Sequence, residues 1–462
     1  MAVEQLTSFW SRNSTLRIGV KGSLAVLTLL FLWYASFTIR LRREPLVPIH
    51  VDRDDFVHRW LETSLLEPFT PSAIRGYCDT VEWRSNLIFN LLDANGGIGN
   101  VRAHFLDYFF YAMEAGAAII LPSTAVRKED NLYDVWGGEG RAPFNRMWDE
   151  AWFKSALKEA CPQMRIYEQP NDPNDLGEHI TDVFMPQSPV QRKDTNRRGW
   201  LDNTNVWLGE HGYMGDRTTP YVVDTGRTMW HVDTRKLSPL LRKNFGMLLR
   251  INPEVRRFAA IAMSNLAAVY GVRLNPSDRM HKNAYYGAHL RTESDAVDAG
   301  YTEGNCDSQS CPLNFAAQTD HYIAAARSVG LRTIFAASGN QTEIEHFRAK
   351  GAGSSPPMIV VDKWDLLSPE EGKKLSDYHW DVQALVDYEI MMRCSVFGSI
   401  AQSSFGWTIA IARTVWMEEE TGYVGDPYFM ESREALRAFD NGLNTLVGRN
   451  YFLEREAPVM FP

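Results

Sequence analysis

One short stretch of the sequence combines a guanidinium with two carboxylates directly after a predicted strand. The strand covers residues 285–291 and ends in His289 and Arg291, and Glu293 and Asp295 follow it. The planar fork of an arginine binds two oxygens of an oxyanion at once, which suits Arg291 to a diphosphate. His289 could contact the ribose, the phosphate or the sugar of such a ligand. The same residues also fit a structural ion pair and a buried histidine that bonds to the backbone.

Two other segments offer backbone amides to an anion. Residues 95–100 (NGGIGN) join an apolar run to a helical pattern, and Ser403 and Ser404 precede Phe405 at the start of another helical pattern. The first N–H groups of a helix have no partner within the helix and can bind a phosphate, and glycines permit positive φ and close backbone approach. A tight turn and an ordinary helix cap explain these residues as well, so neither segment alone identifies a ligand site.

The elements around these residues predict an α/β fold with two parallel sheets. Apolar runs at 87–92 and 117–121 flank helical spacing at 101–116, which is the strand–helix–strand unit of a parallel sheet. Ligands of such sheets lie at the C-terminal ends of the strands, where Arg291, Ser338 and Ser403 fall. We therefore expect two Rossmann-like domains that face a cleft. The strands of the second sheet are expected at 285–291, 333–337, 358–361 and 396–399. We expect the first domain at 81–275, the second at 276–435 and a C-terminal tail at 436–462.

The polar segment 169–220 has few apolar runs and predicts a long loop or lid. Its aromatic side chains could line an acceptor surface or belong to an ordinary surface loop. They are Trp200, Trp207, His211, Tyr213 and the adjoining Tyr221. In the helical pattern that follows, at 253–272, we expect Arg256 to face water.

Residues 22–39 form an uncharged apolar stretch of 18 residues near the N-terminus. That length meets the minimum for a membrane-spanning helix, and Trp33 and Tyr34 suit a membrane interface. A cleaved signal peptide is the alternative, although no small-x-small cleavage site follows. We expect a signal anchor with a cytosolic tail at 1–21, a stem at 40–80 and a lumenal main domain. The protein would then be a single-pass type II protein of the Golgi or endoplasmic reticulum membrane.

Charge and cysteine content narrow the choice of function and compartment. The 462-residue chain has a formal net charge of −9 and no basic stripe, which argues against a nucleic-acid partner. Cys306 and Cys311 are close enough for a small-loop disulfide in an oxidising compartment, Cys78 and Cys161 could form another, and Cys394 fits a buried core position. The cysteines do not have the spacing of a zinc site.

Three blocks of the sequence, in this order, resemble the protein O-fucosyltransferase superfamily. Residues 95–100, with Arg102, are similar to the family's N-terminal loop. This loop has the sequence Gly-Arg-Phe-Gly-Asn-Gln in one branch of the family and Asn-Gly-Gly-Leu-Asn-Gln-Met-Arg in another. Residues 289–295 match a His-x-Arg-x-x-x-Asp block, and residues 387–413 resemble the block whose serines lie beside the diphosphate. The resemblance runs from about residue 87 to residue 416.

The resemblance implies a GT-B-like glycosyltransferase that transfers fucose from GDP-fucose to a protein or glycan hydroxyl, with inversion. It implies that Arg291 stabilises the charge that grows on the GDP leaving group, and that Asn100 faces the sugar and the acceptor. Neither a cofactor nor a metal ion is expected, because no Asp-x-Asp motif follows a predicted strand. The donor-binding residues would be Gly97, Gly99, His289, Asp295, Ser338, Ser403, Ser404 and Phe405.

The sequence departs from the family's pattern at the glycine loop. Gly97 stands where one branch has an arginine, and Val101 stands where that branch has a glutamine. No residue stands out as a catalytic base, for which Glu293 and Asp107 are the candidates. Two other functions are therefore alternatives to a fucosyltransferase. One is a catalytically silent sugar- or protein-binding module on the same fold, and the other is a GT-B enzyme that uses another nucleotide sugar.

Overall fold

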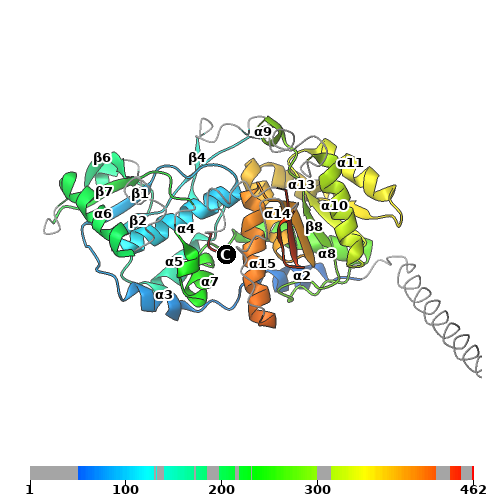
Figure 1. The fold of residues 1–462 in the computed structure, drawn as a ribbon, viewed down its shortest axis with the longest axis horizontal. Coiled ribbons are helices and arrows are strands. Elements are labelled where there is room, and N and C mark those ends of the chain that lie inside the picture. The colour runs from blue at the N-terminus through cyan, green and yellow to red at the C-terminus, as the bar shows by residue number, and fades with distance from the viewer. Residues whose placement is uncertain are drawn as a thin grey trace, which may run out of the picture. The chain divides into compact units, whose positions relative to one another are not determined.

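The core of the protein consists of two mainly parallel β-sheets with helices beside them (Figure 1). The computed structural model describes residues 50–128, 132, 140–170, 173–184, 197–213, 218–229, 232–298, 314–422, 437–448 and 460–462. Residues 50–268 and 272–462 belong to one compact unit, to which the following description refers.

The first sheet has five strands in the order β5-β2-β1-β7-β6, and all neighbours are parallel. β1 and β7 are buried along their whole length, as expected for strands covered on both faces. The structure confirms the strand predicted before the glycine loop, the helix predicted after it and the strand that follows this helix. The elements are β1 (Leu87–Leu91), α4 (Ile98–Glu114), β2 (Ala118–Ile120), α5 (Glu150–Ala160), β5 (Ile166–Tyr167), β6 (Glu178–Phe184), α6 (Arg197–Glu210) and β7 (Tyr221–Thr225).

The second sheet has six strands in the order β10-β9-β8-β11-β13-β12, and only β12 runs antiparallel to its neighbour. All four strands predicted for it are present. The strands are β8 (Tyr286–His289), β9 (Thr333–Ala337), β10 (Ile359–Val361), β11 (Val396–Ile400), β12 (Arg437–Asp440) and β13 (Asn444–Val447). The helices are α9 (Ser294–Asp298), α10 (Phe315–Ser328), α11 (Gln341–Ala352), α12 (Lys363–Leu366), α13 (Pro369–Ser376), α14 (Trp380–Met392) and α15 (Ser404–Thr421).

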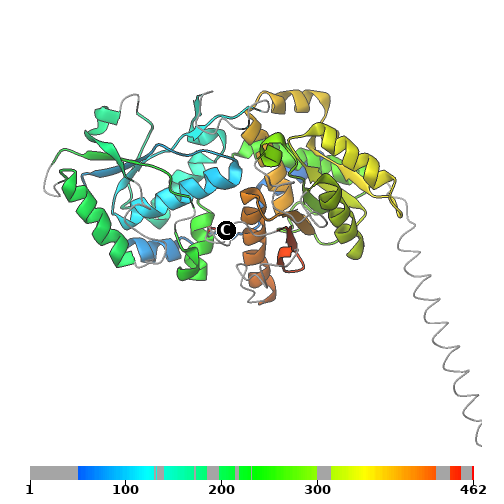
Figure 2. The ribbon, with the colours of Figure 1, turned by 45° about the horizontal axis from the view of Figure 1, so that its top comes forward.

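Two helices connect the sheets. Nearly every residue of α4 is buried, and so is α15 from Gly406 to Met417. A helix that is buried all round must be covered by other elements on every side. α15 contacts α4 as well as β11 and β13, and it lies between the two sheets in both views (Figures 1 and 2).

The prediction of a long loop at 169–220 is wrong, because β6 and α6 lie in this segment and β7 follows it. Trp200 stacks on Tyr111 of α4 with 5.0 Å between ring centroids, and Trp207 packs on Phe184 of β6 at the same distance. The few aromatic residues of α6 therefore bury it against the first sheet, although most of its sequence is polar. Such sparse apolar contacts leave no helical periodicity for sequence reasoning to detect.

The expected stem and the expected C-terminal tail both contain packed elements. Within 40–80 the chain forms α2 (Arg53–Leu61) and α3 (Pro71–Cys78), and residues after 435 supply β12 and β13 of the second sheet. The last residues are also buried: Arg102 of α4 donates hydrogen bonds to the carbonyls of Phe461 and Pro462. Short helical spacing at 55–66 predicts part of this structure, and α2 lies there. The tertiary contacts of the other elements could not be predicted from the sequence.

Contrary to the prediction from the sequence, Arg256 in α8 (Pro253–Tyr270) does not face water. Its side chain is 4% exposed, and its Nε lies 3.2 Å from Oε1 of Glu389 on α14. The same carboxylate oxygen accepts a hydrogen bond from Nε1 of Trp60, whose ring lies 3.6 Å from the guanidinium carbon of Arg393. This buried cluster connects α2, α8 and α14. The remaining elements are α7 (Pro239–Gly246), the separate antiparallel pair β3 (Thr124–Ala125) and β4 (Arg141–Ala142), and the 3-10 helices η1 (Phe144–Arg146), η2 (Pro173–Leu176) and η3 (Thr234–Lys236).

The segment predicted as a signal anchor, residues 22–39, lies outside the described residues. Within the ranges that the structure describes, no helix is both long enough and apolar enough to cross a membrane.

Cys78 and Cys161 form a disulfide, one of the two pairings considered from the sequence, and Cys394 is a buried free thiol as expected. The other pairing, Cys306 with Cys311, lies outside the described residues. The Cys78–Cys161 bond connects the end of α3 to the residue after α5, across 83 positions of sequence.

We predict that replacing both cysteines of this disulfide with alanine lowers the free energy of unfolding by about 2–5 kcal/mol, because a long cross-link restricts the unfolded chain. Dithiothreitol should lower the melting temperature of the wild type and of the Cys394→Ala control, and should have a much smaller effect on Cys78→Ala/Cys161→Ala. Equal melting temperatures of wild type and double variant would contradict the prediction.

Candidate active site

A cavity of about 710 Å³ brings together all the donor-binding residues that the sequence predicts, with Arg291, Asn100 and the candidate base Glu293, but not the other candidate base, Asp107. Its walls come from the glycine loop before α4, the ends of β8 and β9, helix α14 and the start of α15. The predicted residues among its walls are Gly97, Gly99, Asn100, His289, Arg291, Asp295, Ser338, Ser403, Ser404 and Phe405. Segments up to about three hundred positions apart in the sequence therefore meet at one site.

The glycine loop needs its glycines for two different reasons. Gly96 has a φ of +90°, and a Cβ there would lie 2.5 Å from Nδ2 of Asn100, so only glycine fits the turn. A Cβ on Gly99 would lie 2.5 Å from the backbone of Ser404, so Gly99 lets α4 and α15 approach each other closely. Oδ1 of Asn100 is buried and has no hydrogen-bond partner among the described residues.

The start of α15 presents backbone amides to the cavity. Ser403 is the N-cap residue, and its Oγ accepts a hydrogen bond from the amide of Gly406 at 3.4 Å. The side chain of Ser403 thus caps its own helix. The amides of Ser404 and Phe405 lie in the first turn, where N–H groups have no partner within the helix. An anion in the cavity can accept hydrogen bonds from these two amides.

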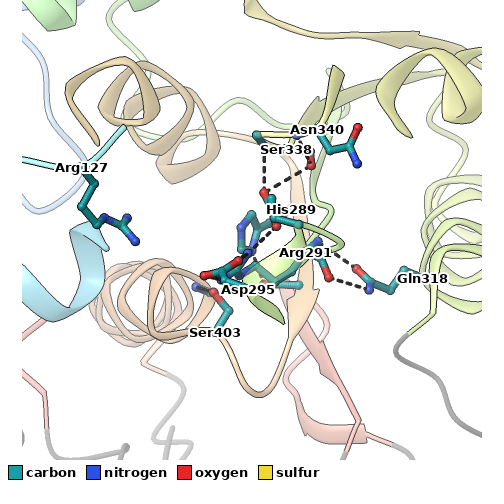
Figure 3. A network of polar contacts seen from close by, with 12 residues as sticks. Arg127, His289, Arg291, Asp295, Gln318, Ser338, Asn340 and Ser403 are labelled. Atoms are coloured by element: carbon teal, nitrogen blue, oxygen red, sulfur yellow. Dashed lines mark hydrogen bonds and ion pairs between the residues drawn. The ribbon is translucent and has the colours of Figure 1, made fainter. Parts of the chain in front are cut away.

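Arg291 is fixed by two carboxylates (Figure 3). Its Nη1 and Nη2 lie 2.8 and 2.7 Å from the two oxygens of Asp295, and Nη1 lies 2.5 Å from Oε2 of Glu293. Gln318 holds the backbone of Arg291 by accepting from its amide and donating to its carbonyl. Burial alone would lower the pKa of Arg291, but Glu293 and Asp295 outweigh this and raise it. The guanidinium is therefore charged and oriented before any ligand binds.

His289 is a neutral, buried ring beside the start of α15. Its Nδ1 lies 2.8 Å from Oγ of Ser399, and its ring centroid lies 4.5 Å from that of Phe405. Burial lowers the pKa of His289 to about 4; Arg291 adds to this effect and Glu293 opposes it. At neutral pH His289 can therefore contact a ligand as a polar ring and cannot neutralise a phosphate.

The loop after β9 is linked to the same cluster. Oε1 of Glu293 accepts from the amide of Gly339 at 2.8 Å and from Oγ of Ser338 at 3.3 Å, and Ser338 in turn accepts from the amide of Asn340. Beside this loop lies the ring of Trp380, which a Cβ on Gly339 would meet at 2.6 Å. Ser338 and Gly339 thus form a narrow wall of the cavity.

A family comparison identifies the chain. The family model described as GDP-fucose protein O-fucosyltransferase matches residues 88–415, which is well over half of the sequence. The chain belongs to this family. It is therefore a glycosyltransferase.

The chain also resembles solved structures that are distant from it in sequence. A crystal structure of POFUT1 in complex with GDP shares 11% identity at a TM-score of 0.43, covering 72% of this chain and 96% of that one. POFUT1 in complex with GDP-fucose shares 13% at a TM-score of 0.41, covering 74% and 96%. A mutant of Arabidopsis thaliana FUT1 in complex with GDP shares 11% at a TM-score of 0.37, covering 80% and 79%. No curated protein sequence matches the chain.

Neither candidate for a catalytic base of this glycosyltransferase is placed to act as one. Asp107 lies in α4, with Oδ2 3.5 Å from the amide of Val232, and is not among the residues lining the cavity. Glu293 lines the cavity but is held by Arg291. Burial alone would raise the pKa of Glu293, whereas Arg291, His289 and the amide of Gly339 lower it. A carboxylate held in this way is a weak proton acceptor.

Sequence reasoning missed two buried ion pairs in the cavity wall. Arg127, after β3, donates from Nε and Nη2 to the two oxygens of Asp381 on α14, at 3.0 and 2.5 Å. Lys363 donates to Oδ2 of Asp387 at 2.6 Å. Burial raises the pKa of Asp387 to about 6, although Lys363 opposes this shift. No local motif marks either pair, because the partners of the first are 254 positions apart and those of the second are on different helices.

We predict that Gly99→Ala weakens both the fold and the cavity. The added methyl group would overlap the backbone of Ser404, and such overpacking costs about 1–3 kcal/mol. The matched control is Gly76→Ala in α3, where a Cβ meets nothing within 4 Å. Chemical denaturation should show a loss of stability for Gly99→Ala only. Equal stability of the two variants would show that α4 and α15 are not in close contact at Gly99.

We also predict a pH effect from His289. Its pKa is lowered to about 4 in the folded protein, so between about pH 6.5 and pH 4 the unfolded chain binds a proton that the folded protein does not. Stability should therefore fall as the pH falls through this window, by about 2–3 kcal/mol from this residue.

The test compares wild type with His289→Gln by urea unfolding at pH 7 and pH 4.5. The free energy of unfolding should fall less in the variant, while the opposite effect of Asp387 is common to both proteins and cancels in the comparison. Parallel changes in the two proteins would show that His289 is protonated normally in the fold.

Proposed function

We propose that this glycosyltransferase transfers fucose from GDP-fucose to a hydroxyl group of a protein or glycan acceptor, with inversion at the sugar carbon. One observation carries the proposal: the cavity places the Arg291 guanidinium and the first-turn amides of α15 beside the glycine loop of α4. These groups can bind a diphosphate. The family's description supplies the identity of the donor.

In this proposal Arg291 stabilises the GDP leaving group. As the bond between fucose and the β-phosphate breaks, negative charge grows on the phosphate, and a fixed cation stabilises that charge better than mobile water does. Asp295 and Glu293 hold the fork of Arg291 in one orientation, so little reorganisation accompanies the reaction. The amides of Ser404 and Phe405 would bind the same diphosphate.

Asn100 would face the transferred sugar. Its side-chain oxygen is buried at the cavity without a partner among the described residues, which leaves it available to a hydroxyl of the sugar or of the acceptor. Ser338 and Gly339 would lie near the nucleotide base, and His289 would contact the ribose or the phosphate as a neutral ring. Neither Glu293 nor Asp107 is assigned as a base in this proposal.

We further propose that the protein is anchored by residues 22–39, with its main domain in the lumen of the Golgi or endoplasmic reticulum. The Cys78–Cys161 disulfide supports this location, because such bonds persist in oxidising compartments. In intact microsomes the main domain should resist added protease until detergent is present. Digestion without detergent would place the domain on the cytosolic side.

The test of donor binding is isothermal titration with GDP. The wild type should bind GDP with micromolar affinity, and Arg291→Ala should lower this affinity by at least about a hundredfold, because the variant leaves two carboxylates facing the diphosphate. Adding Asp295→Asn to Arg291→Ala should restore part of the loss. Arg59→Ala, on the exposed face of α2, is the control and should bind GDP as the wild type does. If the wild type does not bind GDP at millimolar nucleotide, the proposal is wrong.

A further inference from the structure

We propose that Arg127 is a second phosphate-binding residue of the donor site, held by Asp381 so that the free edge of its guanidinium meets the β-phosphate of the nucleotide. This inference rests on the proposed function and adds to it a residue that no sequence motif marks. It concerns binding and positioning of the donor and not a proton transfer.

The guanidinium of Arg127 has one occupied edge and one free edge. Nε and Nη2 donate to the two oxygens of Asp381, which is the bidentate geometry of a strong pair. The side chains of Arg127 and Asp381 are 7% and 8% exposed. Nη1 makes no hydrogen bond to any residue that the structure describes. Because Arg127 lines the cavity, a ligand or water there can accept a hydrogen bond from this group.

Arg127 lines the same cavity as the other anion-binding groups. Figure 3 shows its guanidinium pointing toward Arg291, Asp295 and Ser403 from the opposite wall. Burial alone would lower the pKa of Arg127, but Asp381 outweighs this, and Asp295 and Arg291 also act on it across the cavity. Two guanidiniums thus line the same cavity, Arg127 from the residues after β3 and Arg291 from the residues after β8.

The glycine loop leaves room for this arrangement. A Cβ on Gly97 would lie 3.3 Å from Nη2 of Arg127. The absence of a side chain at position 97 is therefore what lets the guanidinium lie against the start of α4. Gly97 departs from one branch of the family by lacking an arginine, and the structure places the guanidinium of Arg127 over that same position.

The side of the cavity on which Arg127 lies selects the β-phosphate. Nη2 of Arg127 lies 3.3 Å from the Cβ position of Gly97, and Gly99, two residues further on, meets Ser404 at the start of α15. A β-phosphate bound by Arg291 and the first amides of α15 would therefore lie on the side of the cavity where Arg127 lies. Asp381 also prevents Arg127 from swinging toward Arg291, because both of its oxygens are bonded to the arginine. The ring of Trp380, 5.1 Å from the guanidinium carbon, covers the cation.

The experiment compares GDP with GMP, which lacks the β-phosphate, by isothermal titration with the full chain. Arg127→Ala should weaken GDP binding at least about tenfold and change GMP binding less than about twofold. Arg127→Lys keeps the ion pair with Asp381, but the lysine lacks the second pair of guanidinium N–H groups that would bind the phosphate. It should fold with a melting temperature close to that of the wild type and still lose GDP affinity selectively.

Asp381→Asn serves as the comparison for a purely structural role. If Arg127 only joins the segment after β3 to α14, Arg127→Lys, Arg127→Ala and Asp381→Asn will reduce GDP and GMP binding by the same factor, or not at all, and the inference is overturned. A wild type that binds neither nucleotide overturns the proposed function and this inference with it. A wild type that binds GDP while Arg127→Lys binds it equally well overturns this inference alone.

Discussion

The close contact of α4 with α15 is the constraint on which the cavity depends. Gly99 and the backbone of Ser404 meet there without an intervening side chain. This contact puts the glycine loop of the first sheet beside the first-turn amides that follow the second sheet. Because both helices are buried along most of their length, the contact cannot move without repacking both sheets. The cavity is thus formed by the core before any ligand is present.

Three cations in the cavity wall are each paired with one or two carboxylates. Arg291 is paired with Asp295 and Glu293, Arg127 with Asp381, and Lys363 with Asp387. Buried cations would otherwise lose their charge or destabilise the fold, since desolvation of an unpaired ion costs several kcal/mol. The carboxylates keep each cation ionised and fixed in direction. They also reduce its attraction for a phosphate, so binding must depend on geometry more than on net charge.

Much of the fold could be predicted because its central strands are continuous apolar runs and glycine or polar residues follow them. β6 and α6 escaped prediction because their burial rests on a few aromatic contacts, such as Trp200 on Tyr111. The site residues after β8 and before α15 were found because they follow strands, and the cavity does contain them. The partner of Arg127 could not be found, since Asp381 is far away in sequence and meets it only in the folded chain. The roles of these residues remain predictions.

The most direct test of the account is the release of nucleotide from a panel of sugar donors by the full-length protein. We expect GDP to be released from GDP-fucose, slowly with water alone and faster with a crude mixture of secretory acceptors. GDP-mannose and UDP-glucose should be left intact, and Arg291→Ala should release no GDP above background. Release from UDP-glucose in preference to GDP-fucose, or from no donor in the panel, would contradict the account.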